Sequence, residues 1–348
     1  MTEGPAPAVS VVMPVYNSGR WVLEAVESTL RQTLGSLELI AIDDGSTDAS
    51  THLLQQAAGR DRRVRVIRQP HLGIVEAMNR GLAESRAPLL ARLDADDLAH
   101  HTRLARQADF LNARPEVGVV GAWAIEIDGA GRVRGRRTPE TDPKALKQLL
   151  RRTNPIIHSA VMARTDLLRR LGGYRPAFQT AEDYDLWCRA SDVTEIANIP
   201  EFLVSYRMHG AGVSCGDALR QAFSARLAKL SAVARREHGI DPAEALDGPP
   251  DWRSEAAVEA FYAADAGLYR WLDGVDETRD PVAWAGARSL IDGTCELDHA
   301  ERRLAAQAIW RRVRSGDRNA AASARELLVQ LCRRQPTTVL KAAWSLAT

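Results

Sequence analysis

Three carboxylates stand within four residues of the chain, at Asp94, Asp96 and Asp97, directly behind a short apolar stretch at 88–93. Like charges crowded in this way are unfavourable unless a cation joins them. A divalent metal ion that carries a diphosphate would satisfy the group. Asp94 and Asp96 supply only two of the roughly six oxygens that a hard cation prefers, so phosphates and water would complete the shell. The spacing therefore predicts a metal site that its substrate completes.

The stretches that position this cluster alternate between two patterns. Short β-branched runs predict strands at 9–13, 37–42, 64–67 and 89–93, and helical patterns lie between them, the clearest at 19–33 and 73–85. Pro14 is expected to end the first strand, and Asn17 or Ser18 to cap the helix that follows. Repeated strand–helix–strand units predict a parallel sheet with right-handed crossovers.

Ligands of such sheets bind beyond the carboxyl ends of the strands. Polar residues follow the first, second and fourth strands, so they are expected to converge on one rim of the sheet: Tyr16 and Asn17, Asp43 and Asp44, and the three later carboxylates. An acid after the second strand also occurs in dinucleotide-binding enzymes, which need a glycine-rich turn after the first strand. Residues 13–19 lack that turn, so a metal on the later carboxylates must neutralise a diphosphate instead.

The second half of the chain changes character. A strand is expected at 117–123, helices at 143–152 and 166–171, and candidate strands at 195–199 and 203–207. Glu182, Asp183 and Asp185 open another helix, and such acids alone are typical of helix N-termini. Strand signals fade near residue 217, after which five or six amphipathic helices are expected. We predict two domains, an α/β domain at 1–215 and an all-α domain at 216–348.

Composition excludes several classes of protein. The net charge of +1 shows no general attraction for nucleic acid. The four cysteines, Cys188, Cys215, Cys295 and Cys332, form no close pair, which argues against zinc or a disulfide framework. No signal peptide or long apolar run is recognisable. We expect a cytoplasmic protein; the amphipathic stretch at 337–347 packs on its neighbours or docks peripherally at the inner face of a membrane.

Five motifs in order resemble those of the family 2 glycosyltransferases, which have the GT-A fold. They span roughly residues 8–215 and lie at 11–17, 43–48, 79–81, 93–97 and 181–187. The resemblance implies a Rossmann-like, mostly parallel sheet flanked by helices. It also implies a metal-dependent, inverting transfer of a sugar from a nucleoside diphosphate sugar to a glycan or lipid-linked acceptor hydroxyl.

The resemblance also assigns roles to residues. Position in the motifs places the nucleoside and donor beside Pro14, Tyr16, Asp43, Asp44, Arg80 and Asp94. Mn²⁺ or Mg²⁺ is assigned to Asp96, with His209 as a further ligand, and Asp183 matches the catalytic base. Supporting or acceptor-side roles fall to Asp97, His158, Glu182 and Arg207. Inverting displacement needs such a base opposite the leaving group.

Two points stay open at this stage. Glu182 and Asp185 would raise the pKa of Asp183, whereas a helix N-terminus would lower it. A second hypothesis for the whole chain is a non-catalytic binding module on a degenerate GT-A scaffold. A nucleotidyltransferase is a third, but it would carry a glycine-rich basic loop after the first strand, which residues 16–18 do not provide.

Overall fold

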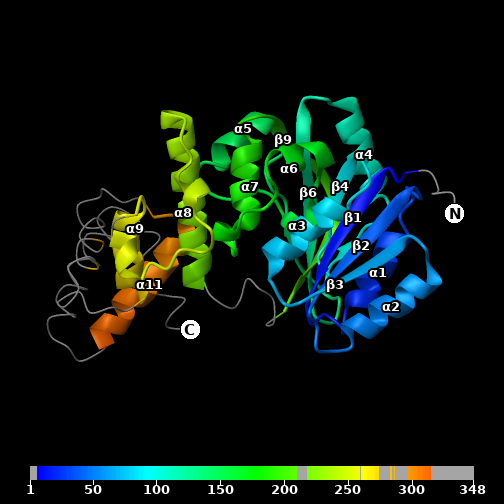
Figure 1. The fold of residues 1–348 in the computed structure, drawn as a ribbon, viewed down its shortest axis with the longest axis horizontal. Helices are drawn as coiled ribbons and strands as arrows, with labels where there is room; N and C mark the ends of the chain where they lie inside the picture. The colour runs from blue at the N-terminus through cyan, green and yellow to red at the C-terminus, as the bar shows by residue number, and fades with distance from the viewer. Residues whose placement is uncertain are drawn as a thin grey trace. The chain divides into compact units, whose positions relative to one another are not determined.

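The computed structural model of the chain describes residues 6–209, 218–258, 260–273, 283, 286 and 297–314 (Figure 1). Its backbone contacts divide the chain into two compact units, Met1–Cys215 and Gly216–Thr348. The roles predicted for the two parts, a catalytic domain at 1–215 and a separate C-terminal domain at 216–348, remain predictions.

The first unit is built on one nine-stranded sheet in the order β3-β2-β1-β4-β8-β6-β9-β5, with β7 paired to β6. The strands are β1 Val9–Val15, β2 Leu37–Asp44, β3 Val64–Gln69, β4 Leu89–Arg92, β5 Leu98–Ala99, β6 Val117–Asp128, β7 Val133–Arg137, β8 Met162–Arg164 and β9 Glu195–Met208. The helices are α1 Val22–Leu30, α2 Ser50–Arg60, α3 Ile74–Glu84, α4 Arg103–Ala113, α5 Pro143–Leu149, α6 Thr165–Arg170 and α7 Glu182–Ala190, with 3₁₀ turns η1 His158–Ala160 and η2 Pro176–Phe178.

The predicted parallel half of the sheet is present. Strands β3, β2, β1 and β4 pair in parallel, so their carboxyl ends share one edge. The other half mixes directions, because β8 runs antiparallel to β4 and β6 while β9 runs parallel to β6.

Two strand boundaries differ from the sequence-based prediction. β1 continues through Pro14 to Val15, because Pro14 lies beyond the last pairing of β1 with β4, at Val12, and keeps a partner only in β2. Proline is tolerated where one side of a strand is unpaired. The two candidate strands after residue 195 form one strand, β9, whose pairing with β6 shifts register around Trp123.

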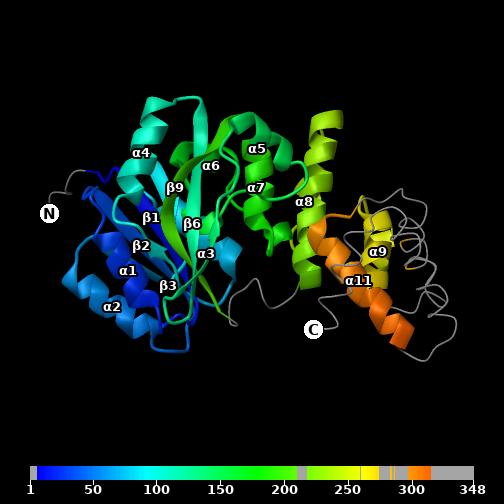
Figure 2. The same cartoon turned by 180° about the vertical axis from the view of Figure 1, so that it is seen from behind.

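The two faces of the parallel half are covered by different helices, as the opposite views of Figures 1 and 2 show. Apolar side chains of β1 and β2 pack against α1, α2 and α4 in the main core. A smaller cluster of Ile40, Ile42 and Ala77 lies between β2 and α3. At Gly81 the helix α3 approaches β1 so closely that a Cβ would lie 2.2 Å from Val12 Cγ1, so only glycine fits.

The second unit is helical in its described part, as predicted. It contains α8 Ala218–His238, α9 Ala263–Asp273 and α11 His299–Arg314, with 3₁₀ turns η4 Pro242–Ala245 and η5 Glu255–Val258. The buried carboxylate of Glu301 accepts from Arg226 and from the Tyr269 hydroxyl, which joins the three helices. The helix expected at 337–347 and three of the four cysteines lie outside the described residues. No helix in the described ranges has the length and apolarity needed to span a membrane.

Candidate active site

The three carboxylates predicted to hold a metal do gather at one place. Oxygens of Asp94, Asp96 and Asp97 all lie within 4.8 Å of one another, just beyond the end of β4. The amide of Asp94 donates to Ser159 Oγ in η1, at 3.0 Å, which ties the cluster to a segment far along the chain. Oxygen ligands grouped in this way suit Mn²⁺ or Mg²⁺.

A buried arginine that the sequence analysis did not single out faces this cluster. Arg92, the last residue of β4, donates from Nη1 to Asp94 Oδ2 at 2.6 Å and from Nη2 to Asp94 Oδ1. Its Nε is buried without a hydrogen-bond partner. The bidentate contact neutralises Asp94, so Asp96 is left as the carboxylate better placed to meet a cation.

The end of β9 closes the other side of the cluster. His209 Nε2 lies 2.7 Å from Asp96 Oδ2, and its ring packs on Trp21 with centroids 4.3 Å apart. Arg207 donates its amide to Asp97 Oδ1 and its Nε to the Asp96 carbonyl, both at 2.7 Å. Its Nη2 also donates to Glu24, at 2.9 Å. These contacts place His209 beside the predicted metal residue and make Arg207 a support for the cluster.

Burial and mutual repulsion raise the pKa values of two acids in the cluster. Burial raises the pKa of Asp94 to about 6, against the attraction of Arg92, and the charges of Asp96 and Asp183 add to the rise. Burial also raises the pKa of Asp97 well above its usual range, with Asp94 and Asp96 adding to it. A cation placed among them would reverse this repulsion.

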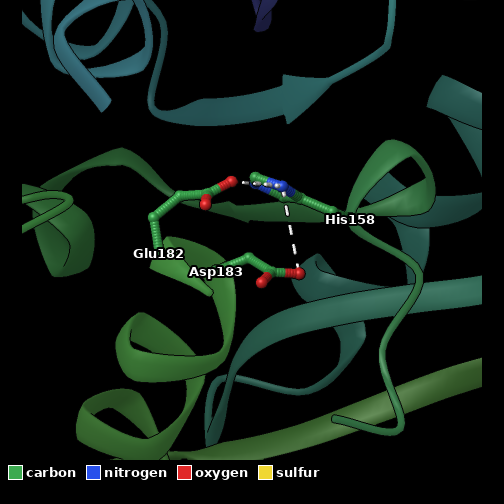
Figure 3. A group of neighbouring side chains, drawn as sticks. All are labelled: His158, Glu182 and Asp183. Carbon is green, nitrogen blue, oxygen red and sulfur yellow. Dashed lines mark ion pairs between the residues drawn. The ribbon is translucent and has the colours of Figure 1, made fainter. Parts of the chain in front are cut away.

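A second acidic group opens helix α7 (Figure 3). Asn154 Nδ2 donates to Asp183 Oδ2 at 2.8 Å, and the amide of Tyr184 donates to Oδ1 at 2.7 Å. His158 Nδ1 lies 3.7 Å from Glu182 and 3.9 Å from Asp183, pointing between them. Thus the three residues that the sequence analysis placed near the acceptor are neighbours.

The direction of the Asp183 shift, which the sequence left open, is upward. Burial raises the pKa of Asp183, although the hydrogen bonds from Tyr184 and Asn154 oppose the rise. Burial and the neighbouring Asp183 raise the pKa of Glu182 to about 8. Asp185 does not contribute to this crowding, because it faces Arg175 and Arg189 instead.

His158 is held as a neutral group. Burial, with the charge of Arg92 adding to it, lowers the pKa of His158 well below its usual range. Its Nε2 lies 3.0 Å from the Tyr174 hydroxyl, and the backbone of Tyr174 exchanges two hydrogen bonds with Asn79 of α3. Tyr174, which is held by α3, therefore orients the ring of His158.

The two acidic groups belong to one site. The charge of Asp183 contributes to the raised pKa of Asp94, and Arg92 acts on both Glu182 and Asp183. The turn η1 joins the two groups in space, because Ser159 accepts from the Asp94 amide while the neighbouring His158 lies beside Glu182 and Asp183.

The residues expected around a nucleoside fall into two sets. Tyr16 is half exposed beyond β1 and stacks on His71, with ring centroids 4.0 Å apart and planes 17° apart. Asp44 also contacts His71, through Oδ2 and Nδ1 at 2.9 Å. His71 was missed because only the loops after the first, second and fourth strands were considered, and it follows β3 on the same edge.

The second set comprises Asp43, Pro14 and Arg80. Asp43, predicted to line the nucleoside pocket, is fully buried and accepts from the amide of Ser46 and the hydroxyl of Thr51. It stabilises the turn into α2, so that prediction is corrected. Pro14 lies within β1, partly buried, and Arg80 pairs with Glu84 on the surface of α3. The diphosphate contact predicted for Arg80 remains a prediction.

Sequence comparison places the chain in a family. The model of Glycosyl transferase family 2 matches residues 10–172. The chain is 35% identical over 187 residues to the putative glycosyltransferase EpsE of Bacillus subtilis (strain 168), which covers 53% of this chain and 66% of that protein. It is 31% identical over 205 residues to the amylovoran biosynthesis glycosyltransferase AmsE of Erwinia amylovora, covering 57% and 75%. The chain therefore belongs to glycosyltransferase family 2.

Solved structures agree on the fold. S. aureus TarS 1-349 in complex with UDP-GlcNAc aligns with a TM-score of 0.61 at 15% identity, over 94% of this chain and 92% of that one. The mannosyltransferase PcManGT from Pyrobaculum calidifontis, in complex with GDP-Man and Mn²⁺, aligns with a TM-score of 0.51 at 17% identity, over 97% and 88%. The predicted family and the GT-A fold with a helical C-terminal region are confirmed.

Proposed function

We propose that the chain is a metal-dependent, inverting glycosyltransferase. It moves a sugar from a nucleoside diphosphate sugar to a hydroxyl of a glycan or lipid-linked acceptor, in the synthesis of a polysaccharide or glycolipid. The observation that carries the proposal is the placement of two acidic groups beside the same turn, η1: the group that contains Asp96 is tied to Ser159 through Asp94, and Asp183 lies beside His158. Transfer needs both a site for the leaving diphosphate and a base for the acceptor.

The relatives support the chemical class of the substrates. TarS has been solved with UDP-GlcNAc and PcManGT with GDP-Man and Mn²⁺. AmsE is described as an amylovoran biosynthesis enzyme, and the chain is also 28% identical to part of the chondroitin synthase of Escherichia coli. By this analogy a nucleoside diphosphate sugar is the donor and a growing glycan the acceptor.

The residues present fit a divalent metal ion. The buried Oδ2 of Asp97 has no hydrogen-bond partner, and Asp96 lies in the same cluster within reach of His209. Mn²⁺ accepts imidazole as well as oxygen, whereas Mg²⁺ favours oxygen alone. When bound there, the metal would offset the negative charge of the departing diphosphate.

Asp183 carries the proton transfer in this proposal. Its carboxylate takes the proton of the acceptor hydroxyl as that oxygen bonds to the anomeric carbon. The bond from the anomeric carbon to the diphosphate oxygen breaks in the same displacement, and the electron pair leaves with the diphosphate. Asn154 fixes the orientation of the Asp183 carboxylate. The raised pKa of Asp183 makes this carboxylate a stronger base than that of an exposed aspartate.

The cellular location follows from the substrates in this proposal. Nucleoside diphosphate sugars are cytoplasmic metabolites, and lipid-linked acceptors lie at a membrane surface. We therefore propose a cytoplasmic location, with peripheral contact at the inner face of the membrane when the acceptor is lipid-linked. The helical unit is the candidate for binding the acceptor or a second subunit.

Hydrolysis of the donor in the absence of acceptor tests the proposal. UDP-GlcNAc, GDP-Man and other common nucleotide sugars are incubated with Mn²⁺, and release of the nucleoside diphosphate is measured. We expect turnover of one donor that chelation of the metal and Asp96→Ala each abolish, while Asp109→Asn, on the exposed surface of α4, retains it. Equal rates for wild type and Asp96→Ala would support the non-catalytic binding module instead.

A further inference from the structure

The carboxylate of Asp44 is occupied by the protein itself. Oδ1 accepts from Gln69 Nε2 at 2.7 Å and from the amide of Leu72 at 2.9 Å. Oδ2 accepts from His71 Nδ1 and from the amide of Gly73, both at 2.9 Å. A carboxylate offers about four acceptor positions. Only 5% of the side chain is exposed, so Asp44 holds the loop after β3 in place.

The same contacts fix the proton on His71. Its Nδ1 faces Asp44 Oδ2 at 2.9 Å and the Asp44 carbonyl oxygen at 3.1 Å. Both partners are acceptors, so Nδ1 must carry the hydrogen. In the neutral imidazole the other nitrogen, Nε2, is then an acceptor.

The ring also has a fixed position. One face stacks on Tyr16, and the chain beneath it passes Gly45, where a Cβ would lie 2.8 Å from the His71 amide nitrogen. Gly45 adopts a φ of +75°, which also favours glycine. The His71 side chain nevertheless remains 55% exposed and Tyr16 47%. With Nδ1 and one face occupied, the Nε2 edge is the polar edge available to a ligand.

We propose that His71 is a specificity-determining residue, which reads the base of the nucleotide donor through Nε2 while Asp44 and Tyr16 hold its ring. An acceptor at Nε2 favours bases whose Watson–Crick edge carries a ring N–H. Uracil and thymine have that hydrogen on N3 and guanine has it on N1. Adenine N1 and cytosine N3 are acceptors that would repel Nε2, so these two bases could meet it only through an exocyclic amino group. The predicted donor is thus a uridine, thymidine or guanosine diphosphate sugar, and UDP represents thymidine diphosphate in the test because both bases present the same edge. This inference rests on the function proposed above.

Binding of UDP, GDP, ADP and CDP to the full chain, each with Mn²⁺, tests the proposal by isothermal titration calorimetry at pH 8, where histidine side chains are in general neutral. For wild type we expect UDP or GDP to bind about 10-fold more tightly than ADP and CDP, the value of one hydrogen bond together with the repulsion avoided.

Two variants separate base reading from ring stacking. His71→Phe keeps an aromatic ring for Tyr16 but has no acceptor, and His71→Ala removes both. We expect both to bring the four affinities to within about 3-fold of one another, since base stacking alone is tolerant of sequence. His52→Ala, an exposed histidine on α2 that contacts Gln56, is the control and should keep the wild-type preference. Thermal melts confirm that each variant is folded.

The outcomes distinguish this inference from the proposed function. A wild-type preference for ADP or CDP, equal binding of all four nucleotides, or an unchanged preference in His71→Phe overturns the role of His71, while the transferase proposal survives. If one variant has a low melting temperature, the other variant still tests the role of His71. The quantity compared is the preference among the four nucleotides, which is measured on folded protein. Binding of none of the four would count against the transferase proposal and against this inference with it.

Discussion

Replacing Glu182 by glutamine tests whether the acidic residues of α7 are buried together. In the folded protein, burial and Asp183 raise the pKa of Glu182 from 4.5 to about 8. Because this pKa is higher than in the unfolded chain, the folded state keeps a proton that the unfolded chain has already released. The stabilisation is complete below pH 4.5 and is lost as the pH rises, until the loss ends near pH 8.

The size of the effect follows from the width of that window. Between pH 5.5 and about 8 the slope is about 1.4 kcal/mol per pH unit but falls off near pH 8, where Glu182 in the folded protein is half ionised. Glu182 would therefore reduce the free energy of unfolding by at most about 3 kcal/mol. Asp183 shares the same proton balance, so we expect a measured effect on the order of 2 kcal/mol. Glutamine cannot ionise. Glu182→Gln should therefore gain about 2 kcal/mol relative to wild type when the pH is raised from 5.5 to 8.

The measurement must report on the first unit alone. Protein is equilibrated in increasing urea at each pH, and a brief pulse of amide deuteration under fixed conditions reports the unfolded fraction of peptides from α7. Glu27→Gln is the matched control, because Glu27 is 57% exposed on α1 and pairs with Arg31. Parallel pH dependences for wild type, Glu182→Gln and Glu27→Gln would show that Glu182 titrates as an exposed glutamate and that the burial argument is wrong.

Four further outcomes can be checked. Asp183→Asn should lower kcat by about 1,000-fold, the middle of the range for a general base, with nucleotide affinity retained in calorimetry; a loss of affinity alone would place Asp183 in binding. The acid limb of the wild-type kcat/KM profile should lie above pH 3.8, since burial raises the Asp183 pKa and the base must be ionised; a limb at or below 3.8 would contradict this. His209→Ala should weaken Mn²⁺ binding to the nucleotide complex by about 10-fold, and unchanged metal affinity would exclude it from the site. Arg92→Met should destabilise the fold by about 3 kcal/mol by leaving Asp94 without its counter-charge, and a melting temperature equal to wild type would refute that pairing.

The parallel half of the sheet could be predicted because the sequence carries its signals locally. β-Branched runs of a few residues alternate with helical periods, and parallel strands joined by crossovers bring their carboxyl ends to one edge. Hence Asp94, Asp96 and Tyr16 were located correctly on that edge. The continuity of β9 was not predictable in the same way, because its partner β6 is distant in sequence and the register shift that accommodates Pro200 depends on that pairing.

Arg92 and His71 show what the local signals leave out. An arginine at the end of a short apolar strand is ordinarily read as a residue that reaches solvent, since charged groups are rarely buried unpaired. Its main partner, Asp94, is two residues away, but the burial of Arg92 and its effect on the acids of α7, about ninety residues later, appear only in the folded structure. His71 lies in a loop with no motif around it, and its importance appears only through its contacts with Asp44 and Tyr16.

Hydrogen bonds and burial together separate the acids that hold the structure from those that can face a ligand. Asp43 accepts two hydrogen bonds and is fully buried, and Asp44 accepts four and is only 5% exposed. The Asp96 side chain contacts only His209 among the contacts described, and Asp183, which accepts two hydrogen bonds as Asp43 does, remains 17% exposed. Spacing in the sequence identifies candidate acids, because chemistry requires carboxylates at strand and helix ends. The donors and the burial supplied by the fold decide which carboxylates remain available for the reaction, and together they favour Asp96 and Asp183.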